Sequence, residues 1–261
     1  MDLQLSNRHV LITGGTRGIG LACARLYLAE GARVSVCGRS AASGEAALGE
    51  LQAPGRVEAH AADLRDPSTA IAMVQAAQAR QGPIDVLVNC AGAAVRRPFR
   101  ELDAAAWQDA MQAKFHSYMN VTDPVIQAMA ARRQGVVINV IGMGGKFPST
   151  THLAGGAANA ALMLATAGLA SAYAAQGVRV NGVNPTLTQT ERLNEGIAAQ
   201  ARQAGISAEE ALQRAAAGLP FQRFATPQEV ADVVVFLSSA RASYVSGAIL
   251  NIDGAVSAAV V

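Results

Sequence analysis

Aromatic and charged residues are scarce in this chain of 261 residues, and cysteine is rare. Aromatic residues make up 4% and charged residues 15%, with 21 Lys and Arg against 19 Asp and Glu. A net charge of only +2 does not provide the basic surface that nucleic-acid binding requires, so we expect no nucleic-acid partner. The hydrophobic share of 51% excludes a disordered chain, because disorder needs low hydrophobicity and high net charge.

The three cysteines, Cys23, Cys37 and Cys90, are widely separated and form no CxxC pair. This spacing predicts neither a disulfide framework nor a metal site. Free cysteines are typical of a reducing compartment, and the N-terminal segment lacks the basic and apolar regions of a secretory signal. We therefore expect a cytoplasmic protein that binds no metal.

Charged residues are also missing from one long stretch, 153–178, which is long enough to span a bilayer. The stretch consists mostly of alanine and glycine and includes Asn159, Ser171 and Gln176, so it is only weakly apolar. A transmembrane helix is the alternative to a core helix whose small side chains let a neighbour approach closely. We expect the core helix, and no membrane partner.

Short β-branched runs alternate with longer alanine-rich segments along the chain. The runs are almost continuously apolar, as expected for strands that are covered on both faces. Strands are predicted at 9–13, 33–37, 57–60, 84–89, 135–141, 178–183 and 248–252. Helices are predicted at 18–30, 43–51, 67–80, 104–132, 152–176 and 227–238.

Two of these predicted helices carry clear start signals. Pro67 and Pro227 suit first helical turns, with Asp66 and Thr226 as the preceding caps. The alternation of strands and helices with short connections predicts an α/β fold with a parallel, doubly wound sheet in a single domain over residues 1–261.

The segment 187–220 interrupts this alternation, since it is polar and helix-prone and carries no predicted strand. An insertion late in such a sheet would lie over the carboxyl ends of the strands, where ligands bind. We interpret the segment as a helical substrate lid. A solvated helical excursion without a role in binding is the alternative.

A glycine-rich turn follows the first predicted strand, with the sequence TGGTRGIG from Thr13 to Gly20. Glycines let the backbone approach a pyrophosphate, and the helix that follows supplies N–H donors and a favourable dipole at its N-terminus. The place of this turn between a strand and a helix distinguishes it from an ordinary glycine turn. The predicted cofactor contacts of the turn are Gly14, Thr16, Arg17, Gly18, Ile19 and Gly20.

Blocks along essentially the whole chain resemble the short-chain dehydrogenase/reductase (SDR) family. The glycine turn matches the TGxxxGxG fingerprint of the family, and residues 89–92 (NCAG) are similar to its NNAG block. Asp63 and Leu64 resemble its adenine-contacting pair, and residues 177–186 resemble GIRVNAVxPG with Thr186 in place of the final glycine. Further matches to the C-terminal blocks lie at 223–231, 244–247 and 253–254.

The resemblance implies a Rossmann-type fold, an oxidoreductase, a small-molecule substrate and a nicotinamide cofactor. It also implies a homo-oligomer, either a dimer or a tetramer, that assembles through two long helices. The cofactor contacts that the resemblance adds are Asp63, Leu64, Asn89, Ala91, Gly92, Asn159, Pro185, Thr188 and Thr190.

The choice between NADP(H) and NAD(H) depends on the residue that ends the second strand. Family members that bind NAD carry an acidic residue there for the ribose 2′-hydroxyl, whereas this chain has Gly38 followed by Arg39. Arg39 can donate paired hydrogen bonds to a 2′-phosphate, and Arg17 adds a second positive charge. We expect NADP(H). The alternative is that both arginines are merely solvated.

All four catalytic positions of the family pattern are altered in this chain. The resemblance implies a tyrosine, a lysine four residues later, a serine and an asparagine at these positions. Aligned without gaps, the serine position holds Gly142, the tyrosine position holds Gly155, and the lysine position holds Asn159. The asparagine position, seven residues after Trp107, holds Lys114.

Glycine cannot donate a proton, and the loss of a positioned acid or base lowers a rate by about 10²–10⁴-fold. Ordinary carbonyl reduction is therefore expected to be very slow, while the intact glycine turn indicates that nucleotide binding is kept. Lys114 is one candidate donor, because its exchange with Asn159 preserves an amide–ammonium pair if the two side chains face each other. His152, three residues before Gly155, is the other, because imidazole titrates near neutral pH.

Each candidate has a plainer interpretation: Lys114 only fills space, and His152 is an ordinary loop residue. Other polar groups close to them in sequence are Lys146, Ser149, Thr150, Thr151, His116 and Tyr118. Three functions are open. The first is an atypical NADP(H)-dependent oxidoreductase that acts on a carbonyl, alcohol or enone through a non-standard proton donor. The second is an inactive NADP(H)-binding sensor or partner protein, and the third is a lyase or isomerase. The intact glycine turn favours the first two, the altered positions favour the second, and the Asn/Lys exchange favours the first, which we expect.

Overall fold

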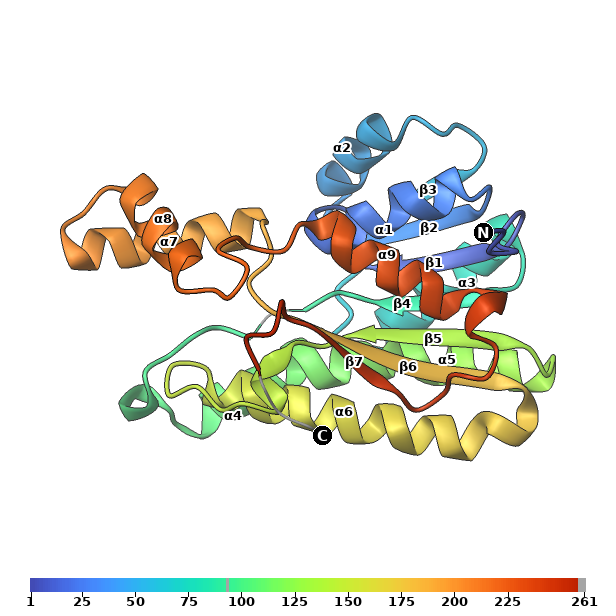
Figure 1. The fold of residues 1–261 in the computed structure, drawn as a ribbon. Coiled ribbons are helices and arrows are strands. Elements are labelled where there is room, and N and C mark those ends of the chain that lie inside the picture. Colours follow the sequence, from blue (N-terminus) through green and yellow to red (C-terminus); the bar gives the residue numbers. More distant parts are fainter. Residues whose placement is uncertain (93, 258–261) are drawn as a thin grey trace.

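A single seven-stranded sheet forms the centre of the computed structural model, which describes residues 1–92 and 94–257 (Figure 1). Its strands are β1 (His9–Thr13), β2 (Arg33–Gly38), β3 (Val57–Ala61), β4 (Val86–Asn89), β5 (Gly135–Val140), β6 (Val178–Pro185) and β7 (Ile249–Ile252). All neighbouring strands run parallel, in the order β3-β2-β1-β4-β5-β6-β7. The order reverses between β1 and β4, so the predicted doubly wound, Rossmann-type sheet is confirmed.

Helices cover both faces of this sheet (Figure 1). One face carries α1 (Gly18–Ala29), α2 (Ala41–Leu51) and α9 (Pro227–Ser238), and the other carries α3 (Pro67–Gln81), α5 (Ser117–Ala131) and α6 (Leu153–Tyr173). Val10 and Ile12 of β1 pack in the core with α1 and α9, whereas Leu11 packs in the core with α3 and α5. Because both faces are buried, the strands are apolar at successive positions, as the sequence predicted.

The start signals of α3 and α9 act as predicted. Asp66 Oδ1 accepts a hydrogen bond from Thr69 N at 2.9 Å, and Pro67 is the first residue of α3. Thr226 Oγ1 accepts from Glu229 N at 3.2 Å, while Glu229 Oε2 accepts from Thr226 N at 2.8 Å. This reciprocal pair is a capping box, which satisfies two backbone donors at the helix N-terminus.

The helix predicted at 104–132 is present with nearly these bounds, but it is not α-helical throughout. It consists of α4 (Ala104–Met111), a π-helical turn η2 (Gln112–His116) and α5. The π-turn lies against the loop that follows β4, where a Cβ at Gly92 would overlap the carbonyl oxygen of Ala113. A π-turn contains one extra residue, so it shifts the side chains that it carries relative to an ideal helix. Short 3₁₀ turns lie at η1 (Phe99–Glu101), η3 (Met143–Gly145), η4 (Ala174–Gln176) and η5 (Ala240–Ala242).

The uncharged stretch forms α6 and the turn η4, and it is long and apolar enough to cross a membrane. Half of this segment is buried inside the fold, where α6 packs against β6, α4 and η3. These contacts are those of the core helix that we expected from the sequence. The segment 187–220 contains α7 (Glu191–Ala204) and α8 (Ala208–Ala217), which project from the carboxyl edge of the sheet (Figure 1). They pack on one another through a small apolar cluster of their own.

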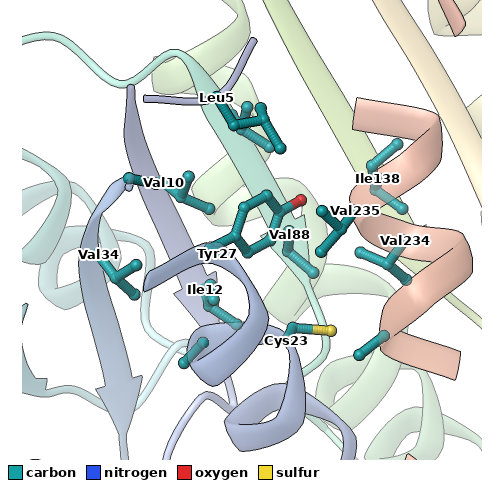
Figure 2. Packing of buried hydrophobic residues seen from close by; sticks show 14 of the residues in the cluster. Leu5, Val10, Ile12, Cys23, Tyr27, Val34, Val88, Ile138, Val234 and Val235 are labelled. Carbon is teal, nitrogen blue, oxygen red and sulfur yellow. The ribbon is translucent and has the colours of Figure 1, made fainter. Parts of the chain in front are cut away.

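Tyr27 joins α1 to α9 inside the core. Its ring is fully buried among valine side chains (Figure 2), and its hydroxyl donates to Ser238 Oγ at 2.8 Å. Burial raises the pKa of the Tyr27 hydroxyl, which therefore stays protonated. Ser238 Oγ in turn donates to the carbonyl of Val235 at 2.8 Å.

Replacing Tyr27→Phe removes this buried hydrogen bond with little change in packing. We expect the free energy of unfolding to fall by about 1 kcal/mol, the usual net worth of one such bond, as measured by urea denaturation. Tyr244→Phe is the matched control, because Tyr244 is fully exposed. Equal stabilities of the two variants would contradict the role of the Tyr27 hydroxyl.

Candidate functional site

Close backbone contact surrounds the glycine turn between β1 and α1. Gly14 has a φ of +66°, and a Cβ there would lie 2.9 Å from the backbone N and Cα of Ala91. A Cβ at Gly20 would overlap the carbonyl oxygen of Gly14. Arg17, at the N-cap of α1, makes no side-chain cap hydrogen bond. The turn therefore forms a tight cradle next to a helix N-terminus without a side-chain cap, where an anion is stabilised by N–H donors.

A side chain at the end of β2 would require the side chains of Thr16 and Ser43 to shift. A Cβ at Gly38 would lie 2.8 Å from both Ser43 Oγ and Thr16 Cγ2, so those two side chains occupy the place where a carboxylate would begin. Arg39 follows with an exposed side chain. The positive charge of Arg39 therefore has no acidic residue before it at the end of β2.

Asp63 lies close to Arg39 across the ends of β2 and β3. A hydrogen bond from Arg65, with a shortest N–O distance of 2.5 Å, and to a smaller extent the nearby Arg39 charge lower the pKa of the Asp63 carboxyl to about 2. Leu64 beside it is buried. The Asp63–Leu64 pair and Arg39 therefore lie at the same edge of the sheet.

The start of the segment after β6 reaches back to the glycine turn. Arg17 forms an ion pair with Glu191 at 3.3 Å, and a Cβ at Gly18 would lie 3.3 Å from Thr190 Cγ2. Thr190 Oγ1 donates to the carbonyl of Thr188 at 3.3 Å. Two parts of the chain that are far apart in sequence, both predicted to contact a cofactor, are thus brought together. Ile19 lies beside Gly18 in the first turn of α1, where it packs against the core.

The NCAG block after β4 is held mainly by the sheet. Asn89 is fully buried, and its Nδ2 donates to Thr122 Oγ1 at 2.8 Å and to Asn139 Oδ1 at 3.0 Å. The backbone N–H groups of Cys90 and Ala91 both donate to Thr13 Oγ1. Asn89 therefore joins β4 to β5 and α5, which is a structural contact that the sequence did not reveal.

Cys90 lies between the glycine turn and the π-turn. Burial raises the pKa of its thiol to about 11, although the positive charge of Lys114 opposes this shift. The thiol is therefore protonated at neutral pH.

Among the described residues, no three His, Cys, Asp or Glu side chains gather in a way that could hold a metal ion.

Lys114 is buried on the π-turn and points to the end of β5. Its Nζ donates to the carbonyl of Val140 at 3.2 Å and to Tyr118 Oη at 3.0 Å. Tyr118 is one helical turn further along, and its hydroxyl donates to the same carbonyl at 2.6 Å. Burial raises the pKa of Tyr118, so this hydroxyl remains a donor. Lys114 and Tyr118 thus act together on one backbone oxygen.

Gly142 follows β5 in a conformation that other residues rarely adopt. Its φ is +121°, and its N–H donates to Asn184 Oδ1 at 3.2 Å. A Cβ would meet nothing closer than Asn159 Nδ2 at 3.5 Å, so the conformation rather than crowding favours glycine here. The sequence analysis missed the contact with Asn184, because it depends on β5 and β6 ending side by side.

Asn159 lies beside Gly142 on α6 and is buried. Its Nδ2 points to the carbonyl of Gly142 at 3.5 Å, and its Oδ1 has no hydrogen-bond partner among the described residues. Lys114 and Asn159 are thus both brought to the carboxyl end of β5, at Val140 and Gly142 respectively. An amide oxygen buried in this way is an acceptor that still requires a donor.

The imidazole of His152 occupies the space beside Gly155. A Cβ at Gly155 would overlap the ring, with His152 Nδ1 only 2.8 Å away. On the other side, a Cβ at Gly144 would lie 3.4 Å from His152 Cδ2 and 3.5 Å from Asn159 Nδ2. The half-buried ring therefore lies between two glycines and next to Asn159. A side chain at position 155 would displace it.

Comparisons with known proteins agree with this architecture. The short chain dehydrogenase family model matches residues 8–201. The chain is 33% identical to 2-(S)-hydroxypropyl-CoM dehydrogenase 3 of Xanthobacter autotrophicus over 260 residues, which cover 99% of this chain and 100% of that protein.

Solved structures of reductases are also similar. L-sorbose reductase of Gluconobacter frateurii, in complex with NADPH and L-sorbose, is 28% identical with a TM-score of 0.94 and full coverage of both chains. Actinorhodin polyketide ketoreductase, in complex with NADPH, is 32% identical with a TM-score of 0.90 over 95% of this chain and 96% of that chain. With a family match over most of its length and a relative that is similar from end to end, the chain belongs to the short-chain dehydrogenase family.

Proposed function

We propose that this protein is an NADP(H)-dependent oxidoreductase that acts on a carbonyl, alcohol or enone with His152 as its proton donor. In this proposal, Gly155 and Gly142 occupy the tyrosine and serine positions of the family pattern, and Asn159 and Lys114 occupy the lysine and asparagine positions. The observation that carries the proposal is the imidazole of His152, which lies where a side chain at position 155 would begin.

The residues present suit NADP(H). The glycine turn leaves no room for a Cβ at Gly14 or Gly20, and the N-cap of α1 makes no side-chain hydrogen bond. The unpartnered Asn159 Oδ1 supplies an acceptor for a ribose hydroxyl. When bound, the cofactor supplies or accepts the hydride. The NADPH complexes of the two similar reductases support the same choice.

Arg39 selects the phosphorylated cofactor in this proposal. Gly38 brings no carboxylate to repel a 2′-phosphate, and a side chain there would require Thr16 and Ser43 to shift. Arg17 contributes less than the sequence analysis expected, because Glu191 neutralises part of its charge. Arg39 thus carries most of the preference.

Replacing Arg39→Ala is expected to weaken NADPH binding by about tenfold or more, since a hydrogen bond to a charged group contributes about 1.5–3 kcal/mol. NADH binding should change little. Fluorescence titration with both cofactors measures this, with Arg25→Ala on the outer side of α1 as the control. Equal losses for NADPH and NADH, or tighter NADH binding by the parent protein, would show that Arg39 does not select the phosphate.

His152 is better placed than Lys114 to donate a proton. The imidazole is half-buried and flanked by Gly144 and Gly155, which leave the ring without a neighbouring side chain at those positions. Lys114 Nζ donates hydrogen bonds to Val140 O and Tyr118 Oη at the end of β5. In this proposal, His152 donates a proton to the substrate oxygen as negative charge develops there. Lys114 positions the end of β5.

Replacing His152→Ala should lower kcat/KM for NADPH-dependent reduction about 100-fold while the Kd for NADPH stays the same. A panel of ketones and enones, followed by NADPH absorbance, measures the first quantity, and added imidazole should restore part of the rate. Lys114→Met is the comparison, and it should lower stability as well as rate. Unchanged turnover in His152→Ala would remove His152 from the mechanism.

An NADP(H)-binding sensor or partner protein is the second candidate function. Glycines at 142 and 155 favour it, since neither carries a side chain to orient or protonate a substrate. Tight NADPH binding without NADPH consumption across the whole panel would support this candidate over the oxidoreductase.

We further propose that residues 187–220 form a substrate lid within one domain that spans residues 1–261. The ion pair between Arg17 and Glu191 connects α7 to the glycine turn, and α7 and α8 project from the carboxyl edge of the sheet (Figure 1). The three cysteines are free and lie buried or half-buried, which suits a cytoplasmic location.

A homo-oligomer through α6 completes the proposal, as a dimer or tetramer. The outward face of α6 carries a stripe of small or apolar residues at helical spacing: Ala157, Ala160, Leu164, Ala167, Gly168 and Ser171. Leu164 is 78% exposed and is the one large apolar side chain among these six residues.

Replacing Leu164→Glu should convert the oligomer to a smaller species, because it places a charge at the centre of the apolar stripe. Light scattering after size-exclusion chromatography measures the mass. Leu212→Glu on α8, at an exposed site outside the stripe, is the control and should leave the mass unchanged. A monomeric parent protein would contradict the proposed assembly.

A further inference from the structure

Two neighbouring loops carry four cationic side chains above the candidate site. One loop follows β4 and contributes Arg96, Arg97 and Arg100, and the other follows β5 and contributes Lys146. We call these four residues the cationic rim. Apolar side chains accompany them in an exposed position: Val95 is 70% exposed, Phe99 54% and Phe147 41%.

The rim lies next to His152. The backbone N–H of Arg97 donates to the carbonyl of Thr151 at 3.1 Å, which joins the two loops one residue before the imidazole. Lys146 directly follows η3, and Gly144 of η3 lies against the same ring. The two loops that carry the rim thus both contact the chain next to His152.

The charges of the rim are not neutralised within the part of the chain that the structure describes. Arginines elsewhere form close ion pairs, such as Arg65 with Asp63 and Arg223 with Glu229. None of the four rim side chains has a carboxylate within ion-pair distance among residues 1–92 and 94–257.

The acidic residues near the rim do not alter this balance. Asp103 caps α4 by accepting from Ala106 N at 2.7 Å, and Glu101 lies in η1 without an ion pair to the rim. Arg100 instead lies over the ring of Phe99 at 5.5 Å. Exposed guanidinium groups beside aromatic rings suit a ligand that combines an anion with an apolar part.

The phosphates of a dinucleotide do not account for the rim. The 2′-phosphate is assigned to Arg39 after β2, and the pyrophosphate to the turn after β1. The sheet order is β2-β1-β4-β5, so the rim loops follow the two strands on the other side of β1 from β2. In this inference, the anion that the rim attracts belongs to a molecule other than the dinucleotide.

We infer that the cationic rim selects a small substrate whose reacting carbonyl or alcohol is joined by an apolar chain to a carboxylate, sulfonate or phosphate group. The chain lies along Val95, Phe99 and Phe147, and the arginines pair with the anion by two parallel hydrogen bonds. This substrate class rests on the proposed function for its reaction, but its binding does not require turnover.

Isothermal titration with 7-oxooctanoate and with its neutral methyl ester tests the inference on the full-length protein, with and without NADPH. The acid is expected to bind at least tenfold more tightly than the ester in 20 mM salt. Raising the salt to 200 mM should weaken only the acid, because exposed charges are screened. The variant R96Q/R97Q/R100Q should lose at least tenfold in affinity for the acid and leave the ester unchanged.

The control variant R25Q/R80Q/R241Q removes the same number of positive charges, but from exposed positions outside the rim, on α1, α3 and η5. It should bind the acid as the parent protein does. Equal affinities for acid and ester, no binding of the acid at millimolar concentration, or equal losses in both triple variants would each overturn the inference. Binding of an acidic phosphopantetheine-bearing carrier protein without binding of the acid would also overturn it, in favour of a macromolecular partner.

Failure of the proposed function gives a different result. Loss of NADPH binding or of turnover, together with preferential binding of the acid, would overturn the oxidoreductase proposal and leave the rim intact. Turnover of neutral ketones with no preference for binding the acid would support the oxidoreductase proposal and overturn the inference about the rim.

Discussion

Backbone contacts that leave no space for a Cβ connect the nucleotide turn to the chemistry of this protein. Gly20 packs on the carbonyl of Gly14, Gly14 packs on the backbone of Ala91, and Gly92 packs on the carbonyl of Ala113. This series runs from the N-terminus of α1 through the loop after β4 to the π-turn. Because Lys114 follows Ala113, the position of its ammonium group depends on three glycines that are far from it in sequence.

A second group of glycines shapes the opposite side of the site. Gly144 and Gly155 leave room that the imidazole of His152 fills, and Gly142 turns the chain away from β5 with a φ of +121°. The imidazole therefore fills the space beside Gly155, and the buried Asn159 Oδ1 nearby has no hydrogen-bond partner among the described residues. In our proposal, the cationic rim on the neighbouring loops adds selection of the substrate by charge.

The exchange of lysine and asparagine has a different consequence from the one that the sequence suggested. The sequence analysis considered that Lys114 and Asn159 preserve an amide–ammonium pair if they face each other. In the structure they contact carbonyls two residues apart on the chain after β5, and Lys114 shares its carbonyl with Tyr118. A buried ammonium group needs several acceptors, and Tyr118 at i+4 together with Val140 supplies two of them. Lys114 consequently holds the carbonyl of Val140 at the end of β5.

The sequence by itself determined the sheet, its strands and the glycine turn, because those depend on local patterns: apolar runs, helix caps such as Asp66 and Thr226, and glycines between strand and helix. Our proposals for Arg39, Asp63 and the catalytic positions also come from the sequence, since each residue lies at a countable distance from a motif. Only the tertiary structure decided that residues 104–132 are interrupted by a π-turn, that Glu191 neutralises part of the Arg17 charge, and that His152 folds against Gly155. These features arise from contacts between segments that are distant in sequence, and no local pattern records which carbonyl or ring a side chain will meet.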